Sequence, residues 1–209
     1  MTSSLELFIG HPIGSVRSLG WFGFAADPPT LAHRAVVDAV LGSGLVEKVI
    51  VFPSGRLDYK EFQCTDWQRA EMVELWKAAA DYGDDVLVSR FDLIRDRAFY
   101  WYDLWRHLHQ IAPKIEHFFV LGSKEYAEIE RKWDRGVELM FNARFIVIPR
   151  SGYPLKSIQS KDYLLPLPPI SGSSTQARKG ERTLLDEQVR KYIVEHHLYS
   201  SHASLLSTA

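Results

Sequence analysis

The stretch that decides the fold lies between residues 20 and 33 and reads Gly20-Trp-Phe-Gly-Phe-Ala-Ala-Asp-Pro-Pro-Thr-Leu-Ala-His33. Its first half is an aromatic, apolar run that suits a strand inside a sheet, and Thr30 stands where a helix N-cap belongs. His33 falls one turn inside that helix, beside free backbone N–H groups and the positive end of the helix dipole. This arrangement predicts an anion site at the carboxyl end of the strand.

The rest of the chain repeats the order of strand and helix. Short β-branched or aromatic runs predict strands at residues 19–24, 48–52, 85–89, 117–122 and 144–149. Helical spacing of apolar residues predicts helices at residues 30–41, 67–80, 101–111, 124–133 and 183–197. The alternation predicts an α/β fold, a Rossmann-like parallel sheet with helices on both faces.

The chain divides into three parts on this pattern. Residues 19–199 form a single domain, residues 1–18 an N-terminal extension whose structure and role stay unassigned, and residues 200–209 a small, polar tail. Within the domain, four prolines between residues 151 and 170 favour an extended crossing segment.

Composition narrows the classes of ligand. The 209 residues carry a formal net charge of -1, which gives no electrostatic footprint for nucleic acid or an acidic membrane and favours a small ligand. We find no basic leader and no apolar run long enough to span a membrane. The single cysteine, Cys64, excludes an intramolecular disulfide and fits a reducing compartment, so we expect a cytoplasmic location. Oligomeric state cannot be inferred from this sequence.

A second candidate site lies near the end of the domain, where residues 170–178 read Ile170-Ser-Gly-Ser-Ser-Thr-Gln-Ala-Arg178. The hydroxyls stand at another helix start, and Arg178 one turn inside would oppose the helix dipole unless a negative group such as a phosphate lay nearby. A solvated loop is an equal alternative for this stretch. On position alone, His33 fits a surface histidine better than a ligand, and Thr30 could be a simple cap.

Taken together, these segments resemble the nucleotidyltransferase superfamily, and within it the nicotinate-nucleotide adenylyltransferases. Thr30-x-x-His33 is similar to the (His/Thr)-x-x-His signature, and Ser173-Ser-Thr-x-x-Arg178 to the Ser-Ser-Thr-x-x-Arg signature. The resemblance covers about residues 18 to 199 in one order. Further similar segments are residues 52–60, ending in Lys60, residues 68–72, 133–135 and 145–154, and the closing helix at 189–199.

The resemblance implies adenylyl transfer from ATP to a pyridine mononucleotide, in which the mononucleotide phosphate attacks the α-phosphorus in line and Mg²⁺ arrives with ATP. No metal ligand from the protein is implied. The residues that it assigns are, as catalytic residues, Thr30, His33 and Arg178; for ATP binding, Gly23, Phe24, Lys60, Gly122, Ser173, Ser174 and Thr175; and for substrate binding, Tyr100, Trp101, Trp133 and Arg150. With Lys60, Arg150 and Arg178 at one sheet edge, we expect a positive cleft within a neutral chain.

Some positions depart from the family pattern and keep two alternatives open. Phe24 replaces the second glycine of the first turn, which favours a non-catalytic nucleotide-binding domain if its ring fills the cleft. Lys124 replaces an acidic residue and Trp101 a threonine, which favours a nucleotidyltransferase with a different phosphomonoester acceptor. The sequence does not distinguish nicotinate from nicotinamide mononucleotide.

Overall fold

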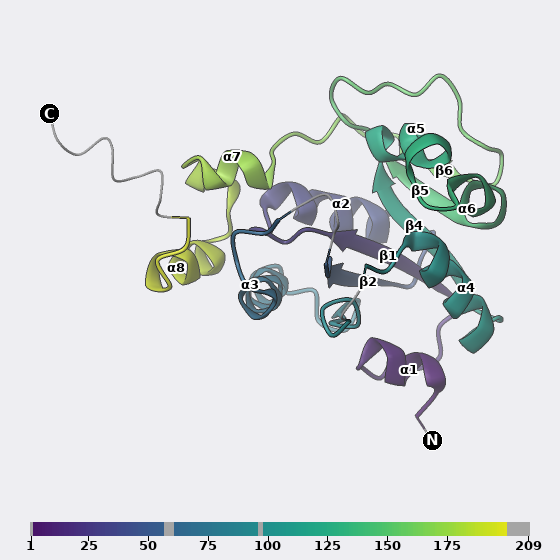
Figure 1. Ribbon diagram of the computed structural model, residues 1–209, viewed down its shortest axis with the longest axis horizontal. Coiled ribbons are helices and arrows are strands. Elements are labelled where there is room, and N and C mark those ends of the chain that lie inside the picture. The colour runs from purple at the N-terminus through teal and green to yellow at the C-terminus, as the bar shows by residue number, and fades with distance from the viewer. Residues whose placement is uncertain (1, 57–60, 96–97, 200–209) are drawn as a thin grey trace, which may run out of the picture.

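The computed structural model describes residues 2–56, 61–95 and 98–199, whose backbone is drawn in colour in Figure 1. Six parallel strands form one sheet in the order β3-β2-β1-β4-β5-β6. The strands are β1 (Ser18–Phe24), β2 (Lys48–Pro53), β3 (Val86–Val88), β4 (Glu116–Gly122), β5 (Arg144–Ile148) and β6 (Tyr163–Leu164). The predicted parallel α/β sheet is confirmed, and the five predicted strands agree with β1 to β5 to within a residue or two at each end.

Alternation along the strands divides the core into two halves. In β1, Leu19 and Trp21 face one side of the sheet while Phe22 and Phe24 face the other. The central strands of the sheet carry apolar side chains on both faces, because helices cover both faces.

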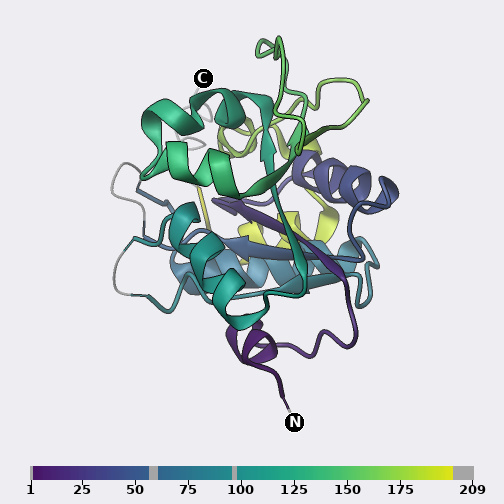
Figure 2. The same cartoon turned by 90° about the vertical axis from the view of Figure 1, so that its right-hand side faces the viewer.

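The helices follow the same division. On the Phe22 side lie α2 (Leu31–Gly42), α3 (Asp66–Ala79), α7 (Ser174–Arg178) and α8 (Glu187–Glu195); on the Trp21 side lie α1 (Ser4–Ile9), α4 (Trp101–Ile111), α5 (Ser123–Lys132) and α6 (Gly136–Asn142). Figures 1 and 2 show this layered arrangement from two directions. Helices therefore cover both faces, as predicted.

The predicted single helix at residues 183–197 is wrong at its start. A short 3-10 helix, η1 (Arg182–Leu184), comes first, and Leu185 is extended and buried. Asp186 then caps α8, and its carboxylate lies 2.6 Å from the guanidinium of Arg34. The Arg34 contact and the burial of Leu185 keep η1 and α8 separate. The spacing of apolar residues does not reveal this break.

Two regions without an assigned structure prove ordered. Ser3 and Glu6 form a capping box at α1, and Leu5 and Ile9 are buried in the core on the Trp21 side. The crossing segment between β5 and α7 contributes β6, and buried Asp162 accepts hydrogen bonds from Tyr126 Oη at 2.6 Å and Phe145 N at 3.0 Å.

Candidate active site

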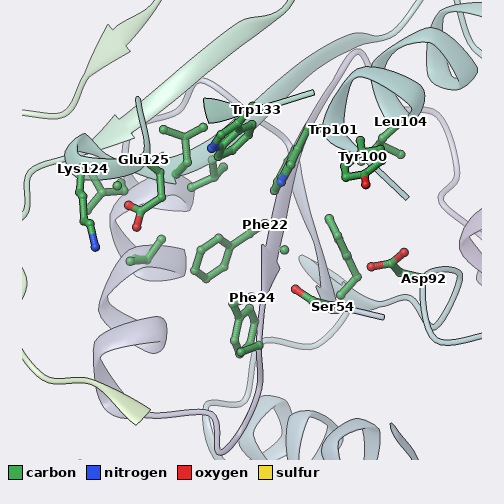
Figure 3. A pocket seen from close by; sticks show the side chains of 18 of the residues that line it. Phe22, Phe24, Ser54, Asp92, Tyr100, Trp101, Leu104, Lys124, Glu125 and Trp133 are labelled. Atoms are coloured by element: carbon green, nitrogen blue, oxygen red, sulfur yellow. The ribbon is translucent and has the colours of Figure 1, made fainter. Parts of the chain in front are cut away.

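A cavity of about 880 Å³ opens where the carboxyl ends of the strands meet (Figure 3). Each of the first five strands contributes to its wall: Phe24 ends β1, Ser54 follows β2, Phe91 follows β3, Gly122 ends β4 and Arg150 follows β5. β1 and β4 are neighbours from which the chain order runs outward in opposite directions, and ligands of open α/β sheets bind at such a switch point.

The turn between β1 and α2 presents His33 to the cavity. The Nδ1 atom of His33 accepts a hydrogen bond from Thr30 N at 3.0 Å and lies 2.9 Å from Thr30 Oγ1. An accepting Nδ1 places the proton of the neutral ring on Nε2, which can then donate to a phosphate oxygen. Thr30 is buried at the N-cap, as predicted, and orients the ring without lining the cavity.

Phe24 forms part of the wall and leaves the cavity open. Its ring stacks on the His33 ring with centroids 4.4 Å apart and on the Phe22 ring at 5.1 Å, and only 8% of the residue is exposed. Figure 3 shows Phe22 and Phe24 between Lys124 and Glu125 on one side and Ser54 and Asp92 on the other. The aromatic ring therefore supports His33 from behind, and the closed cleft expected of a pure binding domain is not observed.

Helix α7 docks onto the same turn. The Ser174 hydroxyl donates to Pro28 O at 2.8 Å, and Ser173 caps the helix. Arg178 donates to Asp27 O, and its Nη2 donates to Thr175 Oγ1 at 3.3 Å. Arg178 lies one turn after the N-cap, as predicted, and because α7 has five residues it is also the last residue of the helix. The negative group beside it is the Asp27 carboxylate, 3.7 Å away.

Asp27 is a buried junction that the sequence did not reveal. Only 1% of the residue is exposed, and besides Arg178 it accepts from Tyr199 Oη at 2.8 Å and Gln63 N at 3.1 Å. These partners come from three separate parts of the chain, so no local motif predicts them. The junction fixes the β1–α2 turn relative to α7 and the end of the domain.

Buried Arg69 of α3 links the first two strand exits. Its Nη1 donates to Ala25 O at 2.8 Å and Ser54 O at 2.6 Å, and both acceptor residues line the cavity. A charge-assisted hydrogen bond to each loop sets their spacing.

The far end of the cavity is aromatic. Trp101 and Trp133 stack with centroids 5.8 Å apart and planes inclined by 27°, and Tyr100 lies beside them (Figure 3). Asp92 borders this end, where its carboxylate accepts from Gly55 N at 2.7 Å and burial raises its pKa. A Cβ at Gly55 would lie 2.2 Å from Asp92 O, so the approach of the two loops requires glycine.

The start of α5 forms the remaining wall. The hydroxyl of buried Ser123, another contributor not predicted, donates to Tyr153 O at 2.7 Å and accepts from Arg150 N at 3.0 Å. This bridge holds the β5 exit against α5. Lys124 lines the cavity next to Gly122, and its Nζ lies 5.5 Å from the centroid of the Tyr153 ring.

The predicted positive cleft is not found, because the described residues of the cavity wall carry charges of both signs. Its cationic side chains are Lys124, Lys132 and Arg150, and its carboxylates are Asp92, Glu125, Glu128 and Asp134. Arg178 is paired with Asp27 away from this wall, and Lys60 lies outside the described residues. This mixture of charges puts cations at particular points of the cavity, but it does not make the electrostatic potential of the whole cavity positive.

Comparison with known proteins identifies the family. The sequence model of the cytidylyltransferase-like family matches residues 21–180. The chain belongs to this family. A relative from Oceanobacillus iheyensis, named "Probable nicotinate-nucleotide adenylyltransferase", is 29% identical over 191 residues, which cover 88% of this chain and 97% of the relative. A protein of the same name from Methylacidiphilum infernorum is 29% identical over 192 residues, with 87% and 91% covered.

The fold of this cytidylyltransferase-like protein also matches solved structures. Plasmodium falciparum nicotinic acid mononucleotide adenylyltransferase complexed with NaAD superimposes with a TM-score of 0.78 at 22% identity, over 88% of this chain and 98% of that one. The family match and the two named relatives confirm the resemblance inferred from the motifs, and this structure shows the same fold.

The structure brings together part of the predicted site. One cavity is lined by His33, Gly23, Phe24, Gly122, Tyr100, Trp101, Trp133 and Arg150. The residues that lie behind this cavity or on α7 are Thr30, Ser173, Ser174, Thr175 and Arg178. Within the described ranges, no group of three His, Cys, Asp or Glu side chains could hold a metal ion. No helix in the same ranges combines the length and hydrophobicity needed to cross a bilayer.

Proposed function

We propose that this chain transfers the adenylyl group of MgATP to nicotinate or nicotinamide mononucleotide, giving a dinucleotide and pyrophosphate in NAD biosynthesis. The observation that carries the proposal is one cavity that has His33, a histidine suited to bind phosphate, on one wall and a stacked tryptophan pair at the other end. Two substrates that each combine phosphate with an aromatic ring suit such a cavity. The named relatives support nicotinate mononucleotide as the acceptor.

The reaction needs no protein nucleophile. A phosphate oxygen of the mononucleotide forms the new bond to the α-phosphorus of ATP, the bond from that phosphorus to the β-phosphate bridge breaks, and pyrophosphate leaves with its magnesium. The protein contributes orientation and charge stabilisation. In this proposal Nε2 of His33 donates to the reacting phosphate, Trp133 and Trp101 bind the pyridine ring, and Arg150 contacts a phosphate. We also keep as a proposal the contacts that the resemblance implies between the β- and γ-phosphates and Arg178, Ser174 and Thr175, which lie on α7 outside this cavity wall.

Magnesium enters this scheme as part of the ATP substrate. Triphosphate oxygens and water are ligands that Mg²⁺ prefers, so the cavity need not supply a protein cage.

We also retain the cytoplasmic location as a proposal. Burial raises the pKa of the Cys64 thiol to about 11, which keeps it protonated and unreactive.

A different phosphomonoester acceptor is the second candidate, favoured by Lys124 in the cavity wall. The two are separated by incubating the protein with MgATP and, in parallel, nicotinate mononucleotide, nicotinamide mononucleotide and a panel of other phosphomonoesters, and following pyrophosphate release. Turnover with a pyridine nucleotide above all others is expected. Turnover with only another acceptor would support the second candidate. ATP binding without release of pyrophosphate from any mixture would favour a binding domain.

A further inference from the structure

The N-terminal helix α1 lies outside the residues that match the family, yet it reaches the back of the cavity wall. Figures 1 and 2 show it beside α4, and two hydrogen bonds tie it to the end of β3. The Ser89 hydroxyl donates to Ile9 O at 2.8 Å, and His11 Nε2 donates to Val88 O at 2.8 Å. The segment of α1 therefore holds the start of the β3–α4 loop.

Phe8 of α1 stands directly behind this loop. Its ring centroid lies 4.6 Å from that of Phe91, and Phe91 is 5% exposed and lines the cavity. On its other side the Phe91 ring meets Phe52 at 4.8 Å, and Phe52 in turn meets Trp101 at 5.7 Å. An unbroken series of ring contacts thus runs from α1 to the tryptophan pair.

The loop is held from the inner side as well. Asp92, next to Phe91, accepts the hydrogen bond from Gly55 N, while α1 packs on the outer side. Side chains in a packed interior keep their position only while neighbours fill the space behind them. Removal of the Phe8 ring would therefore let Phe91 and Asp92 shift away from the cavity.

We propose that α1 is a positioning element for substrate binding, in which Phe8 holds the Phe91–Asp92 wall in place for the pyridine ring. This inference rests on the proposed function for the identity of the ligand. It assigns no chemistry to α1, because Phe8 acts only through Phe91.

The test compares Phe8→Ala with Leu7→Ala, a change one residue earlier on the same helix at a side chain that is 73% exposed. In Phe8→Ala we expect KM for the pyridine mononucleotide to rise about fivefold or more, with KM for ATP and kcat within about twofold of wild type. Leu7→Ala should match wild type, and Phe8→Tyr, which keeps the ring, should restore most of the affinity.

Hydrogen exchange gives a readout that does not depend on turnover. Faster exchange at residues 89–93 in Phe8→Ala, and not in Leu7→Ala, is expected if the ring holds the loop. Unchanged exchange there would overturn the proposal, as would changed exchange with an unaltered KM for the mononucleotide. If wild type turns over no pyridine nucleotide, the proposed function fails by that result alone. The positioning role is then judged by exchange and by the Kd of nicotinate mononucleotide, read from tryptophan fluorescence, where an unaltered Kd overturns it.

Discussion

At the scale of single residues, the protein holds the His33 ring closely. Its Nδ1 atom accepts a hydrogen bond from Thr30 N at the N-cap of α2, and Phe24 stacks against one face of the ring. These contacts fix both the orientation of the imidazole and the atom that carries its proton. Phe24, which would have favoured a binding domain if its ring filled the cleft, therefore contributes to the rigidity of the candidate catalytic residue.

The first prediction concerns His33→Ala. Loss of the Nε2 donor should lower kcat by about 100-fold, the effect of removing one positioned donor from a developing charge, while the Kd of ATP changes little. Steady-state kinetics and ATP titration measure the two quantities. His109→Ala, at an exposed histidine on α4, is the matched control. Equal, small effects on kcat and Kd would show His33 to be a surface residue.

The second prediction concerns Lys124. Replacement by Asp adds a carboxylate to a wall that already carries Asp92, Glu125, Glu128 and Asp134, and like charge disfavours phosphate substrates. We expect kcat/KM with the preferred acceptor to fall about tenfold or more at low salt, and less at high salt. Lys114→Asp, at an exposed position, should leave kcat/KM unchanged. A rise in kcat/KM on Lys124→Asp would show that Lys124 makes no contact with the substrate.

Among the helices and strands, the sequence predicts those whose apolar residues recur at a regular spacing. The strands at the sheet centre are short apolar runs buried on both faces, and α2 to α5 show a clear apolar stripe, so their positions follow from pattern. α6 has only two turns and was not predicted. It begins at Gly136, where a Cβ would lie 1.9 Å from Ile129 O, so close packing against α5 rather than helical spacing determines it.

The third prediction concerns the turn that follows α8, which contains Tyr199. Tyr199→Phe removes one donor to the buried Asp27 carboxylate, which should lower the free energy of unfolding by about 1–3 kcal/mol. Denaturant titration measures the loss. Tyr192→Phe is the comparison, because the Glu71 carboxylate that its hydroxyl contacts is only partly buried and water can replace the bond. The same loss in both variants would mean that the Asp27 junction has no special role in stability.

At the scale of the whole molecule, the parallel sheet gathers loops that are remote in sequence. The sequence could place His33, Trp133 and Arg150 near one sheet edge because each follows a predicted strand or resembles a family segment. It could not assign roles to Asp27, Arg69, Asp92 or Ser123, although each follows a predicted strand or lies in a family-like segment, because their partners lie on other loops and no spacing encodes such contacts. The charge of the cavity was misjudged for the same reason: Arg178 turns to Asp27, and carboxylates from several elements share the wall.

The fourth prediction is a pH dependence of global stability. His117 is a buried residue of β4 whose ring accepts a hydrogen bond from Trp21 Nε1 at 3.1 Å, and burial lowers its pKa to about 4. Between about pH 6.5 and 4 the unfolded chain binds a proton at this position that the folded chain does not. Stability contributed by the neutral ring is therefore lost as the pH falls through this range, by about 3 kcal/mol in total.

Comparison of wild type with His117→Asn isolates this contribution. Asp92 and Asp162 have pKa values raised by burial and so act in the opposite sense in both proteins. Unfolding free energies measured from pH 7 to pH 4 should fall more steeply in wild type than in the variant. Parallel curves would show that His117 does not titrate differently in the folded and unfolded chains.

The cavity is proposed to join the adenylyl group of ATP to a pyridine mononucleotide. This proposal is tested most directly by incubating the protein with nicotinate mononucleotide and MgATP labelled at the α-phosphorus, and following the label. We expect the label to appear in a dinucleotide, with one dinucleotide formed for each pyrophosphate released. Label that remains in ATP, or that is released as free AMP, would contradict the proposal.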